Sequence, residues 1–325
     1  MKIKLWGTRG SIPISNTESV RFGGNTTSVA ISSECIPPGE KLVIDTGSGF
    51  VPFGFEAVKQ GGLKGYNILY THYHHDHTMG LLLAPPTFIE GIEINVYGPV
   101  DHGYGPKNII SDLMKPPKFP VDFREVGGKF NFIKLEYFES KVIIVHPKGG
   151  FKVLTIERYE KNFQNKRQIA FSNGAFDLAE CMVIKMRRAN HPDLTLSYRF
   201  EENPTGKVFV FLTDHEDVPG ISQALKSHVK DSDLLIADAQ YDYKTYKEKT
   251  AGYGHGTPTG CIQLATVTGV KKLGLTHHDP NSTDEKLENV ILKEALESLK
   301  RSKDSQVSLN EENIFICWDY QEIVV

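Results

Sequence analysis

The segment 72–77 has the spacing H-x-H-x-D-H, formed by His72, His74, Asp76 and His77. It directly follows a short apolar run that predicts a strand. Side chains two residues apart share a face of an extended chain, so His72 and His74 are placed to bind one metal ion. We expect the chain to turn into a helix at Asp76 and His77. Their side chains would then point elsewhere and serve a second metal ion.

Imidazole and carboxylate groups are ligands of zinc, and also of manganese and iron, so no thiolate is needed. The alternative is a histidine-rich surface turn that binds no metal. Three further polar positions, each shortly after an apolar run that predicts a strand, argue against that alternative: His191, Asp214 and His277. Each alone is weak evidence, because polar residues commonly follow strands. All three after the H-x-H-x-D-H motif form a more specific pattern.

The composition is that of an ordinary globular protein, with 39% hydrophobic and 24% charged residues among 325. No linker-like or highly charged block divides the chain, so we expect one large domain over residues 1–325. The net charge is −3, from 37 basic and 40 acidic residues, and the sequence shows no basic stripe. A nucleic-acid substrate stays open, but tight binding to a nucleic-acid backbone is disfavoured.

The four cysteines are far apart and form no CxxC pair, which indicates a reducing compartment rather than a disulfide framework. The first residues are too short in apolar length for a signal peptide and indicate a strand. No stretch approaches the roughly 20 apolar residues of a membrane span. We therefore expect a cytoplasmic protein that has no membrane segment.

Runs rich in β-branched and aromatic residues predict many strands. They lie at 3–6, 27–31, 41–44, 67–70, 93–97, 141–145, 152–156, 181–186, 195–200, 207–212, 234–237 and 272–275. Helical patterns are fewer, at 53–60, 80–84, 220–229, 260–268 and 284–300. This combination favours two packed sheets covered by helices. The segment from about 137 to 180 is charged and irregular, and we interpret it as an inserted hairpin or lid.

Four further motifs accompany the histidines: WGTRGSIP at 6–13, FGGNTT at 22–27, IDTG at 44–47, and His191 followed by SYRF at 197–200. Together with H-x-H-x-D-H, they resemble hydrolases of the metallo-β-lactamase fold that bind two metal ions. The resemblance is to the branch of ribonuclease Z and bacterial cyclic-nucleotide phosphodiesterases, and it covers nearly the whole chain outside 137–180. It implies an αββα sandwich of two packed mixed sheets flanked by helices, with the site along one edge of the sheets.

The resemblance also implies a role for each candidate residue. The implied roles are a first metal site of His72, His74 and His191, a second of Asp76, His77 and His277, a bridging Asp214, and Asp45 behind the histidine turn. The implied cofactors are two divalent ions, zinc with manganese or iron as alternatives, that share a hydroxide nucleophile. Asp76 counts with the catalytic residues as well as with the ligands.

A second candidate group lies in the sequence Gly252–Thr257, upstream of the last proposed ligand. In the ribonuclease Z-like branch, a histidine at a similar position pairs with an upstream acidic residue and faces the scissile phosphate. His255 and Asp238 match that pair, with Gly256 where serine is frequent. A histidine held by a carboxylate can donate a proton to the leaving oxygen or contact the phosphate. The alternative is a glycine-rich turn whose histidine only caps the next helix.

The resulting hypothesis is a phosphodiesterase that acts on small or cyclic nucleotide-type substrates. Two proline-stiffened apolar loops, 83–88 and 114–120, could frame a base or ring. A glycine-rich basic arm for gripping tRNA is missing from the sequence, so an RNA 3′-processing nuclease is the less favoured alternative. Hydrolysis of esters, thioesters or lactones on the same site is another alternative, and a non-enzymatic module stabilised by metal is a third. An assembly of two copies is compatible with the sequence.

Overall fold

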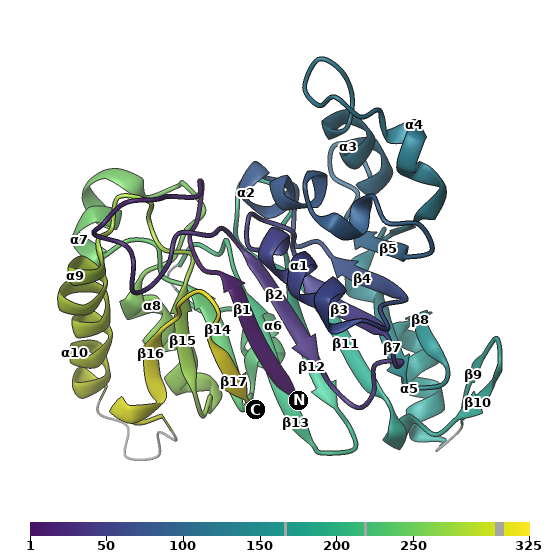
Figure 1. The fold of residues 1–325 in the computed structure, drawn as a ribbon. Coiled ribbons are helices and arrows are strands. Elements are labelled where there is room, and N and C mark those ends of the chain that lie inside the picture. Colours follow the sequence, from purple (N-terminus) through teal and green to yellow (C-terminus); the bar gives the residue numbers. More distant parts are fainter. Residues whose placement is uncertain (166–167, 218–219, 303–308) are drawn as a thin grey trace.

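The computed structural model describes residues 1–165, 168–217, 220–302 and 309–325, and two large mixed sheets organise them (Figure 1). The first sheet contains, in spatial order, β17 (Glu322–Val324), β1 (Lys2–Gly7), β2 (Ser28–Ser32), β3 (Glu40–Ile44), β4 (Gly65–Leu69), β5 (Glu93–Gly98) and β6 (Phe130–Lys134). The second contains β16 (Ile314–Ile316), β15 (Leu273–Thr276), β14 (Leu234–Asp238), β13 (Lys207–Leu212), β12 (Leu196–Glu202), β11 (Met182–Arg188), β7 (Lys141–His146) and β8 (Gly150–Thr155). A separate hairpin pairs β9 (Ile169–Phe171) with β10 (Gly174–Phe176).

Helices occur between several of the strands in the described residues. The α-helices are α1 (Phe50–Gln60), α2 (His75–Thr78), α3 (Pro106–Leu113), α4 (Phe123–Val126), α5 (Ile156–Gln164), α6 (Gln223–Val229), α7 (Tyr243–Thr245), α8 (Pro258–Thr268), α9 (Asp284–Lys286) and α10 (Lys293–Arg301). Short 3-10 turns are η1 (Met79–Leu82), η2 (Pro85–Thr87), η3 (Gly127–Lys129), η4 (Phe138–Ser140), η5 (Leu178–Glu180) and η8 (Glu311–Asn313), and π-helical turns are η6 (Tyr246–Thr250) and η7 (Leu287–Leu292). None of these helices is both long and apolar enough to span a bilayer.

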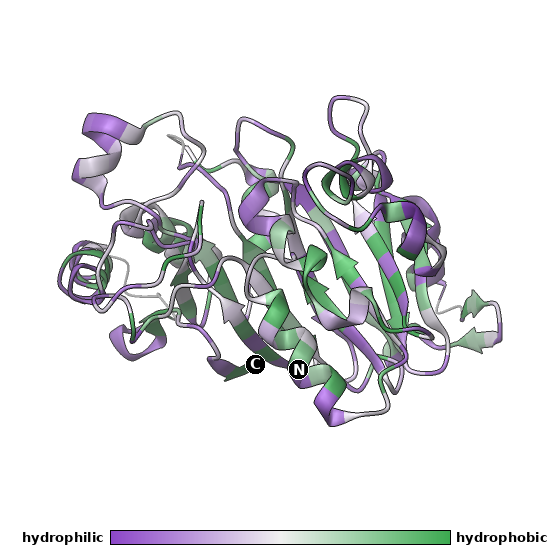
Figure 2. Ribbon diagram, turned by 45° about the horizontal axis from the view of Figure 1, so that its top comes forward, coloured by the Kyte–Doolittle hydropathy of each residue, from purple (hydrophilic) through white to green (hydrophobic). Residues whose placement is uncertain are grey.

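Three of the four apolar clusters among the described residues hold the two large sheets, α1 and α8 together. Buried side chains from facing strands, such as Leu5 and Phe209, fill the space between the sheets. A second cluster packs α1 against the outside of the first sheet, and a third packs α8 against the outside of the second sheet. Figure 2 shows hydrophobic residues concentrated along the strands. The expected αββα sandwich of two mixed sheets flanked by helices is confirmed.

The direction of the strands explains where polar residues can gather. β3, β4, β5 and β6 run parallel to one another, as do β13, β14, β15 and β16 in the other sheet. The carboxyl ends of parallel strands meet at one edge, where loops can present side chains that the sheet holds in place. The segments that follow β3, β4, β11, β13, β14 and β15 carry the candidate residues, and β11 ends at the same edge because β11 and β13 are both antiparallel to β12.

The segment 137–180 is more regular than its charged sequence suggested. β7 pairs with β11 inside the second sheet, and β8 pairs with β7 at its edge. Residues 157–163, which we expected to be irregular, belong to α5. Thr155 caps this helix by accepting a hydrogen bond from the Arg158 N–H, and Tyr159 is buried. In Figure 1 the β9–β10 hairpin lies at the lower right edge of the molecule, away from α2 at the upper middle. A lid function for this segment stays a prediction.

Candidate metal centre

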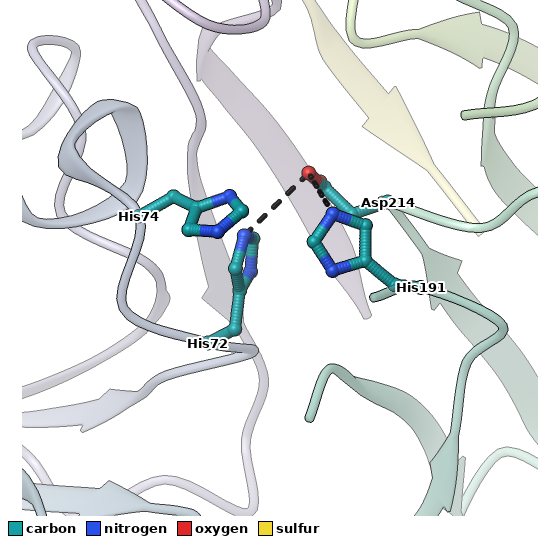
Figure 3. Close-up of side chains that lie close together, drawn as sticks. All are labelled: His72, His74, His191 and Asp214. Atoms are coloured by element: carbon teal, nitrogen blue, oxygen red, sulfur yellow. Dashed lines mark ion pairs between the residues drawn. The ribbon is translucent and has the colours of Figure 1, made fainter. Parts of the chain in front are cut away.

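The first group of potential ligands converges from three loops. His72 and His74 follow β4, His191 follows β11, and Asp214 follows β13. One ligand atom from each of these four residues lies within 4.8 Å of the others. Asp214 Oδ2 is 3.5 Å from His72 Nε2 and 3.9 Å from His191 Nε2, and Figure 3 shows both rings directed at this carboxylate. The arrangement offers three imidazoles and one carboxylate oxygen around a single point.

The second group lies on the other side of the same carboxylate. Asp76 and His77 belong to α2, where the chain turns after the histidine loop, and His277 follows β15. Asp76 Oδ2 is 3.3 Å from the Nε2 atoms of both His77 and His277. Asp214 Oδ1 is 3.3 Å from His77 Nε2 and 3.2 Å from His277 Nε2. The two oxygens of Asp214 therefore face different groups, which is the geometry of a bridging ligand.

The donor atoms fit two divalent metal ions. His72 Nε2 is buried and has no hydrogen-bond partner among the described residues, although it points into the first group. A buried polar atom without a partner is costly, and a metal ion at this point would satisfy its lone pair. The seven side chains supply nitrogen and oxygen donors in a mixture that suits zinc, manganese or iron. Clusters of histidine and aspartate that could hold metal ions are thus present, and the geometry leaves the identity of the metal open.

Polar neighbours hold several of these rings from behind. Asp45, at the end of β3, has Oδ2 at 2.8 Å from His77 Nδ1. The N–H and the hydroxyl of Thr71 donate to the two oxygens of Asp45 at 2.8 and 2.7 Å. Thr195 Oγ1 lies 3.1 Å from His191 Nδ1. Such contacts fix the orientation of an imidazole and raise its basicity as a ligand.

His74 is the most exposed member of the first group, with 45% of its side chain accessible to solvent. Its Nε2 lies 2.8 Å from Asp193 Oδ2, so Nδ1 is the nitrogen left to face the other ligands. Sequence reasoning missed Asp193. Its position two residues after His191 was the only available signal, and it does not by itself indicate contact with a residue 119 positions away.

Three strand-end residues adopt left-handed backbone conformations. The φ angles are 55° at Asp45, 50° at Asp214 and 60° at His277. Non-glycine residues pay about 1–3 kcal/mol for such strained conformations, and these concentrate where side chains must be aimed. Here the left-handed conformation directs each side chain out of the line of its strand and toward the shared centre. The packing of the two sheets must offset the free-energy cost of these three conformations.

His255 and Asp238 form a further pair beside the candidate metal ligands. Asp238 is the last residue of β14, and its Oδ2 lies 2.9 Å from His255 Nδ1. The His255 ring stacks on His277 at a centroid distance of 5.0 Å and keeps 12% of its side chain exposed. The helix that follows is capped by Thr257, whose hydroxyl oxygen accepts from the Gly260 N–H. His255 is therefore not the cap of that helix and faces the site instead.

A pocket of about 370 Å³ opens over these groups. Its lining residues are Ser11, Tyr73, His74, His75, Asp76, Asp214, His255 and His277. The pocket thus contains members of both ligand groups together with His255. It is the place where a substrate could contact all three.

Two family models match consecutive parts of the chain. The model described as "Metallo-beta-lactamase superfamily" matches residues 22–151, and the one described as "Beta-lactamase superfamily domain" matches residues 140–278. The chain belongs to the metallo-β-lactamase superfamily. It is accordingly a metal-dependent hydrolase, as the resemblance of its motifs implied.

Several metallo-β-lactamase relatives are similar over most of their length. The ribonuclease Z of Clostridium kluyveri is 28% identical over 300 residues, which cover 86% of this chain and 89% of that protein. The structure of yeast PDE1 matches with a TM-score of 0.61 at 12% identity, covering 100% of this chain and 99% of that one. The short form of human tRNase Z matches with a TM-score of 0.57 at 18% identity, covering 100% and 99%. These two structures share the fold.

The charges of this metallo-β-lactamase site are strongly coupled. Burial alone would raise the pKa of Asp214, but His277, His77 and His72 outweigh it and hold the pKa well below its usual range. Burial would lower the pKa of His277, but the Asp214 and Asp76 carboxylates raise it to about 9. A metal ion that binds to His277 at neutral pH must therefore displace a proton.

Two acidic residues that sequence reasoning missed hold the loop of His255. Glu216 Oε1 accepts hydrogen bonds from the Gly252 N–H at 2.6 Å and the Tyr246 hydroxyl at 2.8 Å, and Oε2 accepts from the Gly254 N–H at 3.0 Å. Asp217 Oδ2 accepts from the N–H and the hydroxyl of Thr257 at 2.9 and 2.7 Å. They lie two and three residues after Asp214, so one loop carries the candidate bridging carboxylate and also holds the segment of His255.

Proposed function

We propose that this metal-dependent hydrolase is a phosphodiesterase with two divalent metal ions, acting on small or cyclic nucleotide-type phosphodiesters. The division of the Asp214 oxygens between two ligand groups is the observation that carries the proposal. The His255–Asp238 pair in the same pocket supports phosphodiesters over carbonyl substrates, because an expelled alkoxide needs a proton donor. Esters, thioesters and lactones are the alternative substrates.

The proposed roles follow from the contacts of each residue. Metal ions bound here would supply positive charge for the phosphoryl oxygens and would lower the pKa of a water molecule. The candidate ligand Asp214 would join the two groups, with His72 in the first and His77 in the second. Asp76 contacts His77 and lines the pocket on the side of the second group. Asp238 accepts from His255 Nδ1 and fixes the ring, so that Nε2 can donate a proton to the leaving oxygen.

Two observations bear on the size of the substrate. A pocket of about 370 Å³ is of the size that binds a single small ligand. The net charge of −3 does not favour a long polyanion. The name of the Clostridium kluyveri relative supports the second candidate, cleavage at the 3′ side of RNA precursors. We keep the small phosphodiester as the first proposal and RNA processing as the second.

The deciding experiment combines metal analysis with a substrate panel. The purified protein should contain about two metal ions per chain and should hydrolyse bis-p-nitrophenyl phosphate in a chelator-sensitive manner. The panel then compares cyclic nucleotides, a tRNA precursor with a 3′ extension, p-nitrophenyl acetate and a lactone. Preference for the precursor would move the assignment to RNA processing, and activity confined to the carbonyl substrates would overturn the phosphodiesterase proposal.

Replacing His255 with alanine tests the role of the proton donor. We expect His255→Ala to lower kcat by about 10²- to 10⁴-fold, because a positioned acid contributes that much. The metal content should stay near that of the native protein, since His72, His74, Asp76, His77, His191, Asp214 and His277 are unchanged. His102→Ala is the control, because 80% of the His102 side chain is exposed. Full activity in His255→Ala would exclude the role.

A further inference from the structure

One side chain in the pocket has a hydroxyl that no role described so far uses. Ser11 lines the pocket beside Asp76, Asp214, His255 and His277. The other hydroxyl there belongs to Tyr73, and it donates to the Pro99 carbonyl at 2.7 Å. Ser11 itself is exposed on the N-terminal loop. Its hydroxyl is therefore accessible to a molecule that enters the pocket.

The backbone around Ser11 is held firmly against the site. The Ser11 N–H donates to Asp76 Oδ2 at 2.8 Å, and the Gly10 N–H donates to the His278 carbonyl at 3.0 Å. A Cβ atom at Gly10 would lie 2.4 Å from His277 Nδ1, so only glycine allows this approach. Buried Arg9 donates to the carbonyls of Gly23, Asp279 and Ser282. The loop is thus a fixed wall of the pocket.

Ser11 also adopts a conformation that serine rarely takes. Its φ angle is 61°, in the left-handed region that favours glycine, asparagine and aspartate. Glycine would adopt this φ angle without strain, and because Ser11 is exposed, the change to glycine would cost no packing. Strained residues at such places commonly serve function, which makes the hydroxyl the feature to explain.

A buried amide orients this hydroxyl. Gln240 is 1% exposed, and its Nε2 donates to Ser11 Oγ at 3.2 Å. The Ser11 oxygen accepts that bond, so its own proton is free to be donated into the pocket. The Gln240 N–H in turn donates to Asp238 Oδ1 at 3.0 Å, while Asp238 Oδ2 contacts His255 Nδ1 at 2.9 Å. One carboxylate therefore fixes both His255 and the amide behind Ser11.

We propose that the Ser11 hydroxyl donates a hydrogen bond to a non-bridging oxygen of the substrate phosphoryl group, with Gln240 as its positioning residue. The inference rests on the proposed phosphodiesterase function and adds a contact from the N-terminal loop, next to Asp76. A donor that is already oriented stabilises charge that develops in the transition state without reorganisation. Ser11 is then a catalytic residue contributed by the N-terminal loop.

The test removes the hydroxyl while keeping the backbone. Ser11→Gly suits a φ of 61° and retains the N–H that holds Asp76. We expect kcat/KM for bis-p-nitrophenyl phosphate to fall by roughly 10- to 100-fold, the usual effect of a hydrogen bond to a charged group. The affinity for inorganic phosphate, measured by calorimetry, should fall as well. Metal content and the thermal unfolding midpoint should not change.

Matched variants separate binding from structure. Ser15→Gly removes an exposed serine of the same loop that does not line the pocket, and it should behave as the native protein. Ser11→Asn tolerates the left-handed backbone and restores a donor, so it should recover part of the activity. Gln240→Leu should lower kcat/KM in the native background but not in Ser11→Gly.

Each outcome is assigned in advance. If the native protein hydrolyses phosphodiesters and Ser11→Gly matches it in rate and phosphate affinity, the inference on Ser11 is wrong. Loss of metal from Ser11→Gly also overturns it, because the loop would then act through Asp76. If the native protein hydrolyses no phosphodiester, the proposed function fails, and phosphate affinity still reports on Ser11.

Discussion

Asp45 shows how much a buried residue outside the ligand set can control. It is completely buried, and burial raises the pKa of its carboxyl while His77 and Thr71 oppose that shift. Its oxygens receive the Thr71 N–H and hydroxyl and contact His77 Nδ1. Asp45 thus connects the end of β3 with both the histidine turn and α2.

We predict that Asp45→Asn lowers metal affinity by about 10- to 100-fold, the usual cost of losing a carboxylate behind a ligating imidazole. The dissociation constant for zinc, measured by competition with a chromogenic chelator, checks this. Asp112→Asn is the control, because Asp112 lies on the surface, where it pairs with Lys115 and Lys118. Equal affinities in the two variants would show that Asp45 does not support His77.

At the scale of elements, the loop after β13 combines two tasks. Asp214 at its start faces both ligand groups, and Glu216 fastens the segment that carries His255. A displacement of about 1 Å in a catalytic group can cost on the order of 100-fold in rate. The position of His255 therefore depends on the hydrogen bonds that Glu216 accepts from the N–H groups of Gly252 and Gly254.

We predict that Glu216→Ala lowers kcat by roughly 10- to 100-fold while metal content stays constant, because His255 loses its fixed position. Limited proteolysis within the segment 246–254 should become faster at the same time. Glu248→Ala, at an exposed glutamate of that segment, is the control. Unchanged kcat and proteolysis in Glu216→Ala would refute the role of this contact.

The pattern of residues in the sequence was sufficient to predict elements whose formation depends mainly on their own residues. The strands before His72, Asp214 and His277 were predicted to within about two residues, because β-branched and aromatic runs are a local property. The helix expected at 284–300 begins at α9, where the Thr283 hydroxyl oxygen accepts from the Lys286 N–H. The helix after it is interrupted by η7, which the periodicity of apolar residues did not indicate.

Features that depend on distant contacts were missed. β16 and β17 are three residues each, too short for a periodic signal, and pairing with β15 and β1 determines them. Contacts of Asp193, Glu216 and Gln240 likewise join residues far apart in the chain. Composition also misled us at α5, where charged residues cover the exposed side of a helix whose Tyr159 is buried. A single sequence does not show which residues that lie far apart in the chain will contact one another.

At the scale of the whole molecule, a buried histidine links stability to pH. His228 on α6 packs against β12, where Ser197 Oγ lies 3.0 Å from its Nε2. Burial lowers the pKa of His228 from 6.5 to about 3, and the positive charges of Arg199, Arg187 and Lys185 contribute to the same shift. The folded protein therefore keeps this ring neutral, whereas the unfolded chain binds a proton below about pH 6.5. The contribution of His228 to the free energy of unfolding thus falls as the pH decreases from about 6.5 to about 3.

We predict that His228→Gln flattens this pH dependence, because glutamine can contact Ser197 but does not titrate. Urea unfolding of the metal-free protein at about pH 5 and about pH 7.5 measures the difference. His102→Gln should leave the slope as in the native protein, since His102 is exposed. The same slope in all three proteins would mean that His228 does not cause the loss of stability in acid.

The proposed metal ligands come from the two halves of the chain, and His77 and His277 are 200 positions apart. A ribosome adds roughly 5–20 residues per second, so the histidine turn is made on the order of 10–40 s before its last partner. Through most of that interval the nascent chain lacks Asp214, and through all of it the chain lacks His277. Metal captured early would be held by an incomplete set of donors and could be lost to competing thiols. The full set of candidate donors therefore exists only after β13, β14 and β15 of the second sheet have been made.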